Sequence, residues 1–315
     1  MRNQKINFQL ALIGFGVSAR ANHLPAIADS GRFELTAIVD PVSTYANIDC
    51  FTSIAALQKS HLQIDAVALC TPPSDRVSLI GQCLEAGWHI MLEKPPVATA
   101  NDLEKLRELP NPVDCSIFAT WHSVENPAVD AAARWLERHP VHELRLRWLE
   151  HVNDWHPNQN WLWRENGFGV FDAGINAFSI LDHILPGTLS ISEAELFIPK
   201  NVATPATAEL QFALNGRPIG LASLDLLHPG APVWAISILS GGSELLLLDG
   251  GKRLDINGRT MPTEGTAEYE RVYGKFANLI DRHQSSVETR PLELVLDALN
   301  RGKATTVAPI DIEQI

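Results

Sequence analysis

A glycine-rich turn lies between an apolar strand and a helix near the start of the chain. Phe8–Ile13 predicts a buried strand, and the next six residues read G-x-G-x-x-A. The first glycine allows a tight turn, the second lets a phosphate approach the main chain, and the alanine lets the helix pack closely. Free N–H groups at the helix start attract phosphate. The pattern predicts a dinucleotide site, and its residues are Gly14, Phe15, Gly16, Val17, Ser18 and Ala19.

The second apolar strand, Phe33–Val39, ends in Asp40. A carboxylate at this position accepts hydrogen bonds from both hydroxyls of an adenosine ribose. It also repels the additional phosphate of NADP, and no Arg or Lys occurs in residues 41–44. An ordinary turn before Pro41 would also explain an acid here, but the glycine-rich turn upstream favours the cofactor. We therefore predict that NAD is the cofactor and that NADP is disfavoured.

Strands and helices alternate through the first part of the chain. The helices are predicted at residues 53–59, at 74–86 with Ser74 as the cap, and at 99–109. The further strands are predicted at residues 64–70, before Glu93, and at 115–120. This alternation is typical of a doubly wound parallel sheet, the α/β Rossmann class. The first domain is predicted to cover residues 1–122.

Two strand ends in this domain carry polar residues next to prolines. One strand leads into Thr71-Pro72-Pro73, and the next leads into Glu93-Lys94-Pro95-Pro96. Ligands bind at the carboxyl ends of strands in open α/β sheets. A lysine in a surface loop is the plainer explanation, but the prolines stiffen the main chain and aim the amine in one direction. Thr71, Pro72, Glu93 and Lys94 are therefore predicted to line the cofactor site, with Lys94 in a chemical role.

The second part of the chain, residues 123–315, has a different order of predicted strands and helices. Residues 143–152 alternate, with Leu144, Leu146 and Trp148 on one face. Further strands are predicted at residues 194–198, 208–214, 219–227, 234–239 and 245–248, and helices at 124–138, 170–185, 266–283 and 292–301. Asn215-Gly216, Gly241-Gly242 and Asn257-Gly258 mark turns. We predict an α+β domain with an open, mainly antiparallel sheet that is covered on one face.

An aromatic segment in this domain contains Trp155, His156, Trp161 and Trp163. Aromatic density alone fits a core or interface patch equally well. In a sugar pocket, indoles cover C–H faces while polar groups hold hydroxyls. The adjacent histidine favours the pocket.

A glycine-led helix follows, with Asp172 and Asn176 four residues apart. They share one helix face near its N-terminus, where the remaining side chains are apolar or small. An acid at a helix start is stabilised by the helix dipole alone, and Asn176 could simply be solvated. Two polar groups together on such a face favour a site.

Composition excludes several classes of partner. The formal net charge is −12, which argues against nucleic acid and anionic membranes because both need a basic surface. Residues 1–9 lack the apolar core of a signal peptide, and no apolar run approaches the length of a membrane span. The four cysteines lack metal-site spacing, so we expect reduced core residues, no metal site and a cytoplasmic location. They are Cys50, Cys70, Cys83 and Cys115.

Taken together, the glycine-rich turn, Asp40, Thr71-Pro72, Glu93-Lys94-Pro95 and the Asp172 helix resemble the Gfo/Idh/MocA oxidoreductases. The order and spacing match across nearly the whole chain. The resemblance implies a Rossmann domain, a second domain for substrate and oligomerisation with an open antiparallel sheet, and NAD(P)-dependent oxidation of a sugar or polyol. It also implies a homo-oligomer paired through the second sheet and a Lys94–Pro95 bond that is often cis.

One departure from the family pattern narrows the expected substrate. Most members carry Asp-x-x-x-His, where this chain has Asp172 and Asn176. Residues 119–123, 155–161 and 169–176 resemble bacterial members that oxidise the anomeric carbon of D-galactose or L-arabinose to the lactone. In the arabinose-oxidising members that use NADP, Ser-Arg stands where this chain has Asp40-Pro41, so the resemblance also favours NAD.

The resemblance implies roles for single residues. Lys94 and Asp172 would be catalytic, with either one as the base, and the cationic nicotinamide ring disfavours a second positive charge on Lys94. The residues expected to bind the sugar are His122, Glu150, Trp155, His156 and Asn176. Two alternatives stay open: oxidation of a polyol or cyclic diol, and a non-catalytic sugar-sensing regulator.

Overall fold

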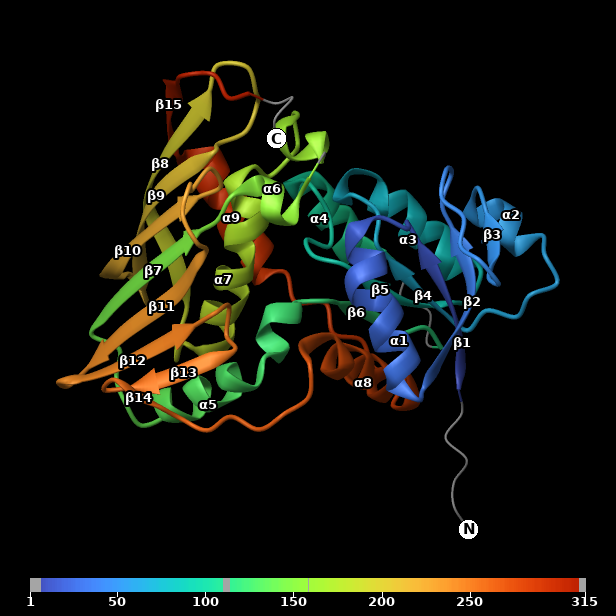
Figure 1. Cartoon of the computed structure of the whole chain (residues 1–315), viewed down its shortest axis with the longest axis horizontal. Coiled ribbons are helices and arrows are strands. Elements are labelled where there is room, and N and C mark those ends of the chain that lie inside the picture. The colour runs from blue at the N-terminus through green and yellow to red at the C-terminus, as the bar shows by residue number, and fades with distance from the viewer. Residues whose placement is uncertain (1–6, 110–113, 158, 312–315) are drawn as a thin grey trace, which may run out of the picture. The chain divides into compact units, whose positions relative to one another are not determined.

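The computed structural model describes residues 7–109, 114–157 and 159–311. It contains two compact units (Figure 1). The first comprises Met1–His122 with Thr266–Thr289, and the second comprises Ser123–Gly265 with Arg290–Ile315. Within the described ranges, no helix is both long and apolar enough to span a membrane.

The first unit is built on a six-stranded parallel sheet. Its strand order is β3-β2-β1-β4-β5-β6, the order of a dinucleotide-binding doubly wound sheet. Central strand β4 is buried along its whole length and β1 is buried from Leu10 onward, because helices cover both faces of the sheet. The predicted α/β class is confirmed. The strands are β1 (Phe8–Ile13), β2 (Phe33–Val39), β3 (Asp49–Phe51), β4 (Ala66–Leu69), β5 (His89–Leu92) and β6 (Ile117–Ala119).

The helices of this unit differ from the prediction at one cap. Ser74 lies inside a short 3₁₀ turn, η2 (Pro73–Asp75), and Asp75 is the residue before the following helix. Pro73 fixes φ for that turn and starts the helical chain one residue before the predicted cap. The helices are η1 (Ala19–His23, a π-helical turn), α1 (Leu24–Ser30), α2 (Ile54–Gln58), α3 (Arg76–Glu85), α4 (Ala100–Glu108) and α8 (Glu268–Asp281), with η3 (His122–Glu125) at the junction.

Helix α8 belongs to the first unit although its sequence lies far downstream. Its apolar face packs into the core formed by β1, β2 and β6, where Phe276 stacks on Phe33 and Phe118. Figure 1 shows α8, in orange and red, beside α1, in blue. The expected boundary between residues 122 and 123 is therefore the first point at which the chain passes from one unit to the other. The chain passes between the units again before and after α8. The apolar face of residues 266–283 predicted a helix there, but it did not predict which core would bury that face.

The second unit contains a nine-stranded sheet of order β14-β13-β12-β11-β7-β10-β9-β8-β15. Most neighbours are antiparallel, while β7 with β10 and β8 with β15 are parallel. Edge strand β15 was not predicted because its residues are mostly exposed and lack an apolar face. The strands are β7 (Glu143–Leu149), β8 (Leu189–Pro199), β9 (Thr207–Leu214), β10 (Arg217–Asp225), β11 (Val233–Ser240), β12 (Ser243–Leu248), β13 (Arg253–Ile256), β14 (Arg259–Thr260) and β15 (Lys303–Val307).

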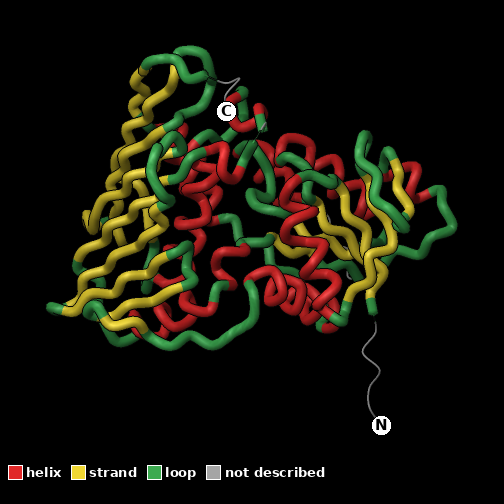
Figure 2. The backbone as a smooth tube through the Cα atoms, in the orientation of Figure 1, coloured by secondary structure: helices red, strands yellow, loops and turns green. Residues whose placement is uncertain are grey.

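Helices cover one face of this sheet, as Figure 2 shows. Leu144, Leu146 and Trp148 are buried on the covered face, while Arg145 and Arg147 between them are exposed. Helix α5 begins at Pro127 rather than at Val124, because proline is favoured in the first turn and the preceding residues form η3. The helices are α5 (Pro127–Leu136), α6 (Val152–Trp155), η4 (Asn160–Trp163), α7 (Val170–Ile184) and α9 (Arg290–Arg301).

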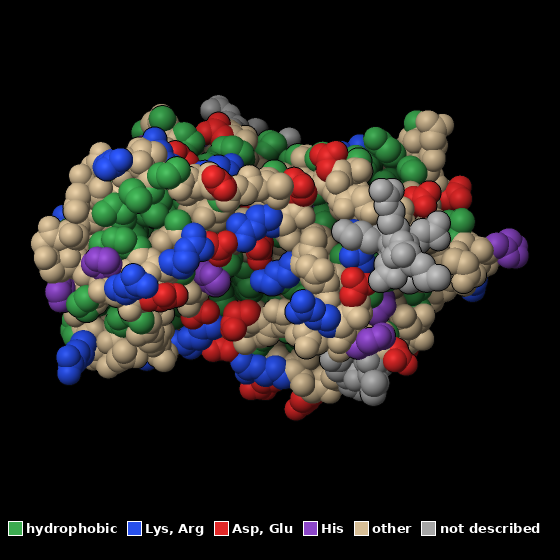
Figure 3. All heavy atoms as spheres, turned by 90° about the horizontal axis from the view of Figure 1, so that it is seen from below, with side chains coloured by type: hydrophobic (Ala, Val, Ile, Leu, Met, Phe, Trp, Pro, Cys, Tyr) green, Lys and Arg blue, Asp and Glu red, His purple; other side chains and the backbone are tan. Residues whose placement is uncertain are grey.

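Acidic and basic side chains are interspersed on the molecular face shown in Figure 3. The net charge of −12 is therefore not expressed there as a continuous acidic surface.

Candidate functional site

The glycine-rich turn of the first unit is shaped for close approach of a ligand. Gly14 has φ of 89°, and a Cβ on it would lie 2.8 Å from the amide nitrogen of Thr71. A side chain is therefore excluded there. A Cβ on Gly16 would meet nothing within 4 Å, so its main chain borders open space. This bare, open main chain fits the pyrophosphate of a dinucleotide.

The helix after the turn places the remaining residues of the motif. Ala19 is fully buried in the core of the unit, which keeps the helix close to β1. Val17 is exposed and Ser18 is half-buried, so both are on the accessible side of the turn. Phe15 is buried, with the guanidinium of Arg20 4.0 Å from its ring centre.

Asp40 joins the glycine-rich turn to the loop after β2. One carboxylate oxygen accepts a hydrogen bond from the amide of Phe15 at 2.9 Å, and the other accepts from Val42 and Ser43 at 3.0 and 2.7 Å. Partial burial works to raise the pKa of Asp40, but these hydrogen bonds dominate and lower it. The carboxylate is therefore ionised and fixed at the strand end, as a ribose-binding acid requires.

Thr71-Pro72 and Glu93-Lys94 lie at neighbouring strand ends. They follow β4 and β5, which pair in parallel, so both lie at the same sheet edge as Gly14 and Asp40. Lys94 is half-buried, and the Lys94–Pro95 bond is cis. The structure thus brings together the residues predicted for the cofactor.

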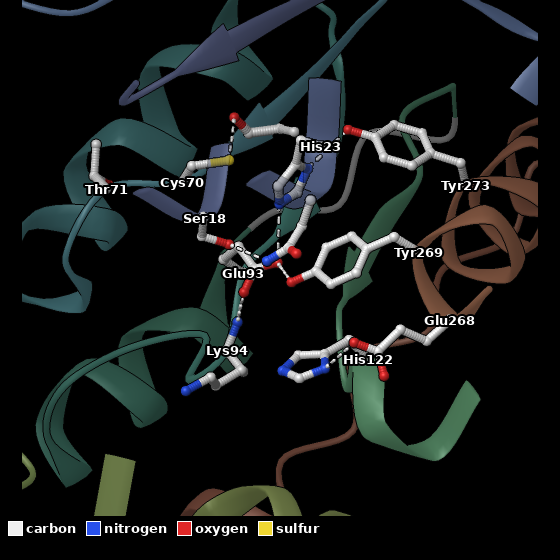
Figure 4. A network of polar contacts seen from close by, with 12 residues as sticks. Ser18, His23, Cys70, Thr71, Glu93, Lys94, His122, Glu268, Tyr269 and Tyr273 are labelled. Carbon is white, nitrogen blue, oxygen red and sulfur yellow. Dashed lines mark hydrogen bonds and ion pairs between the residues drawn. The ribbon is translucent and has the colours of Figure 1, made fainter. Parts of the chain in front are cut away.

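A buried polar network surrounds Glu93 (Figure 4). Its Oε1 is 3.0 Å from Nε2 of His23 and accepts a hydrogen bond from the Tyr269 hydroxyl at 2.8 Å. Its Oε2 accepts from the amide of Lys94 at 3.1 Å. The other ring nitrogen of His23 is 2.8 Å from the hydroxyl of Tyr273. Three segments of the chain thus meet on one carboxylate beside Lys94.

The network contains two ionisable groups, Glu93 and His23, that are buried from solvent. Burial favours protonation of Glu93, yet its contacts with His23 and Tyr269 lower its pKa to about 2. Burial works against a charged His23, but Cys70, Tyr273 and Glu93 raise its pKa well above the ordinary value. Burial also raises the pKa of Tyr273 to about 12. The Glu93 carboxylate is therefore paired with the imidazolium of His23 next to the main chain of Lys94.

His23, Tyr269 and Tyr273 belong to this network, but no sequence pattern predicts a functional role for them. His23 is fully buried at the end of η1, and both tyrosines lie on the apolar face of α8. A histidine inside an apolar helix and two tyrosines on a core-facing stripe were the available signals. Each is more often a core residue, and only the fold brings them together.

His122 lies in the first unit, at the start of η3. Its Nδ1 is 3.3 Å from Oε1 of Glu268, and its ring stacks on Tyr269 with 5.4 Å between ring centres. The contact with Glu268 and the stacking on Tyr269 together fix the ring plane of His122. Figure 4 shows His122 and Lys94 in the same region of the unit.

Asp172 and His156 form a pair in the second unit. Nε2 of His156 is 3.4 Å from Oδ2 of Asp172, and Asp172 is only 3% exposed. Asp172 occupies the first turn of α7, which begins after Gly169 at φ of 50°. A Cβ on Gly169 would clash with the carbonyl oxygen of Pro205 at 2.2 Å, so glycine is required there. Asn176 lies one turn later and is half-buried.

Glu150 and two tryptophans form a second polar and aromatic cluster of this unit. Glu150 follows β7 on the covered face and is buried. One of its carboxylate oxygens accepts a hydrogen bond of 2.7 Å from the indole of Trp234. Trp155 lies 5.1 Å from Trp234 between ring centres and is 47% exposed. Trp234 lies inside strand β11, where the sequence pattern predicts an ordinary strand residue.

The tryptophans of the aromatic segment therefore differ in how far they are buried. Trp155 offers an accessible indole, while Trp163 is buried at 4% exposure and serves the core. The indole of Trp161 donates to the side chain of Gln159 at 3.1 Å. Asn158, in the middle of the segment, lies outside the described residues. The core interpretation thus applies to Trp163, while the sugar-pocket interpretation stays a prediction for Trp155.

The predicted residues thus divide between the units. Lys94, His122 and the cofactor residues lie in the first, while Glu150, Trp155, His156, Asp172 and Asn176 lie in the second. In the part of the chain that the structure describes, no three His, Cys, Asp or Glu side chains form a group suited to a metal ion.

Known proteins resemble this chain over most of its length. The model of the Gfo/Idh/MocA family, described as an oxidoreductase family with an NAD-binding Rossmann fold, matches residues 8–119. A galactose 1-dehydrogenase from Pseudomonas fluorescens is 34% identical over 304 residues, which cover 95% of this chain and 97% of that protein.

Solved structures extend the likeness to the whole fold. The crystal structure of a D-galactose-1-dehydrogenase protein from Rhizobium etli has a TM-score of 0.91 at 37% identity and covers 99% of this chain and 100% of that one. KijD10, a 3-ketoreductase from Actinomadura kijaniata, has a TM-score of 0.78 at 15% identity over 96% of this chain and 99% of that one, which shows a shared fold alone. The full-length relative at 34% identity and the family match place the chain in the Gfo/Idh/MocA family of oxidoreductases.

Proposed function

We propose that this chain is an NAD-dependent aldose 1-dehydrogenase that oxidises C1 of D-galactose, or of L-arabinose, to the lactone. One observation carries this proposal. Both galactose 1-dehydrogenases match at least 95% of the chain, so the likeness includes the second unit as well as the common Rossmann part. The residues of that unit suit a sugar, because carboxylates, an imidazole, an amide and an accessible indole can bind hydroxyls and C–H faces.

The first unit would hold the cofactor. The open main chain at Gly16 would receive the pyrophosphate, and the ionised Asp40 would accept hydrogen bonds from the ribose. Thr71, Pro72, Glu93 and Lys94 lie at the same sheet edge and would line the cofactor site there. Bound NAD would supply the hydride acceptor for the oxidation.

The proton of the C1 hydroxyl needs a base. We assign this role to Lys94, with Asp172 as its partner, and the reverse assignment uses the same two groups. The buried Asp172 is held by His156, while Lys94 is held through its main chain by Glu93. His122, Glu150, Trp155 and Asn176 would then orient the sugar, with Trp234 fixing the carboxylate of Glu150.

Sugar epimers test this function. D-galactose and L-arabinose share ring stereochemistry from C1 to C4, including an axial C4 hydroxyl, whereas D-glucose has an equatorial one. We assign recognition of this hydroxyl to His156 and Asn176. D-glucose should therefore be oxidised with kcat/KM lower by about 10²-fold or more, since its binding leaves polar groups unpaired. Discrimination between galactose and arabinose should be weaker, because they differ only by the hydroxymethyl group.

The measurement is NADH formation with the three aldoses, inositol and a cyclic diol as substrates. Asn176→Ala should narrow the gap between galactose and glucose. Equal efficiency on glucose and galactose would remove the roles given to His156 and Asn176. A higher efficiency on the inositol or the diol would replace the aldose by a polyol, and absence of turnover on every substrate would favour a regulator.

Cofactor choice gives a second test. Asp40→Ser combined with Pro41→Arg should shift preference from NAD toward NADP, because it removes a carboxylate next to the additional phosphate and adds a positive charge. The ratio of kcat/KM for the two cofactors should change in favour of NADP by at least about tenfold. Asp40→Ser alone should lower NAD efficiency with a smaller gain on NADP. A wild-type enzyme that is more efficient with NADP would contradict the assignment.

A further inference from the structure

Arg76 is a buried arginine at the first position of α3, with only 2% of its surface exposed. Its guanidinium donates hydrogen bonds to the carbonyl oxygens of Glu93, Pro95 and Thr71. The first two carbonyls flank Lys94, and the third belongs to the neighbouring strand end. A single side chain thus joins the two loops that are predicted to line the cofactor site, one of which carries Lys94.

The local sequence explains why donors are needed here. Pro72, Pro73, Pro95 and Pro96 lie at these two strand ends, and proline has no N–H to donate. Buried carbonyl oxygens that lose their hydrogen bonds are costly. Arginine presents five N–H donors in a rigid planar fork, whereas lysine presents three on a flexible stem. The guanidinium therefore suits a junction of several fixed carbonyls.

Lys94 is thereby held on both sides. Arg76 fixes the carbonyls before and after it, and the Glu93 carboxylate accepts the hydrogen bond from its amide at 3.1 Å. Glu93 is itself fixed by His23 and Tyr269. With the main chain immobilised, the direction of the Lys94 side chain is set by its own few torsions. Such support is what a catalytic group needs to stay within about 0.5 Å of its working position.

We propose that Arg76 is a positioning residue that sets the main chain of Lys94, and through it the placement of the amine against C1 of the substrate. This inference rests on the proposed function. Arg76 itself is buried, and its guanidinium binds the main-chain carbonyls on both sides of Lys94. Loss of the guanidinium should therefore slow the chemical step more than it weakens binding of the cofactor.

The test compares Arg76→Lys and Arg76→Ala with wild type, and Arg282→Lys serves as control because Arg282 is exposed in the same unit. We expect Arg76→Lys to lower kcat by about 10-fold to 100-fold, since small displacements of a catalytic group have effects of this size. The Kd of NADH, from fluorescence titration, should change much less. Added guanidinium ions at millimolar concentration should restore part of kcat in Arg76→Ala, while ammonium ions should not.

Two results would overturn the inference. One is wild-type kcat in folded Arg76→Lys. The other is a rise in the Kd of NADH as large as the fall in kcat, which would make Arg76 a support for cofactor binding. If Arg76→Ala does not fold, Arg76→Lys decides alone by the kcat and Kd comparison. Failure of the proposed function is distinguished from these results, because then wild type itself would oxidise no aldose.

Discussion

Lys94→Met is expected to lower kcat for D-galactose oxidation by about 10² to 10⁴-fold, the range contributed by a positioned general base. Methionine keeps most of the length of the unbranched side chain but cannot accept a proton. Binding of NAD should persist, because the glycine-rich turn and Asp40 are unchanged and lie on other strand ends. The measurements are steady-state NADH formation and a binding titration with the cofactor.

Lys59→Met is the matched control, since Lys59 is an exposed lysine of the same unit and lies at the end of α2. It should leave both quantities unchanged. The assignment of Lys94 is refuted if Lys94→Met binds NAD fully and turns over like wild type. A far larger loss in Asp172→Asn than in Lys94→Met would instead make Asp172 the base.

The second large effect concerns stability of the first unit. Glu93→Leu and His23→Leu should each lower the free energy of unfolding by about 3–5 kcal/mol, because each leaves one member of a buried ion pair without its partner. The double variant should cost clearly less than the sum of the two, since neither charge is then buried alone. Urea unfolding followed by circular dichroism measures all four proteins.

The pH dependence of this pair follows from the two pKa shifts. Glu93 has its pKa lowered to about 2 from an ordinary 4.5, so its contribution is complete above pH 4.5 and is lost as the pH falls toward 2. His23 has its pKa raised above an ordinary 6.5, so its contribution is complete below pH 6.5 and is lost as the pH rises through the folded value. Stabilisation by the pair is therefore greatest between pH 4.5 and 6.5.

Unfolding of wild type and the double variant at about pH 3, 5.5 and 9 tests this window. The difference in free energy of unfolding should be largest at the middle value. Glu104→Ala, at an exposed position of α4, is the control and should change stability little at any pH. Additive effects of the two leucine substitutions, or a difference that is constant with pH, would show that the network carries no paired charge.

Local patterns in the sequence predicted much of this protein. The bounds of β1 and β2 were predicted to the residue, because an apolar run bounded by glycine or an acid is a short-range signal. The α/β class and the open, mainly antiparallel second sheet were also predicted from periodicity and turn residues. Gly14, Asp40, Thr71 and Lys94 could be found because each follows a predicted strand, and parallel strands end at one edge.

The tertiary structure alone decided which distant segments meet. The sequence separates His23 from Tyr273 by 250 residues, yet the two side chains lie 2.8 Å apart because α8 packs on the core of the first unit. Arg76 and Trp234 looked like ordinary helix and strand residues until their hydrogen-bond partners were known. Periodicity specifies which face of an element is apolar, but not which of several apolar surfaces will bury it. Hydrogen bonds between polar side chains of different elements form only when those elements have packed together. In this chain, the polar groups that surround Glu93 and Lys94 are brought together in this way.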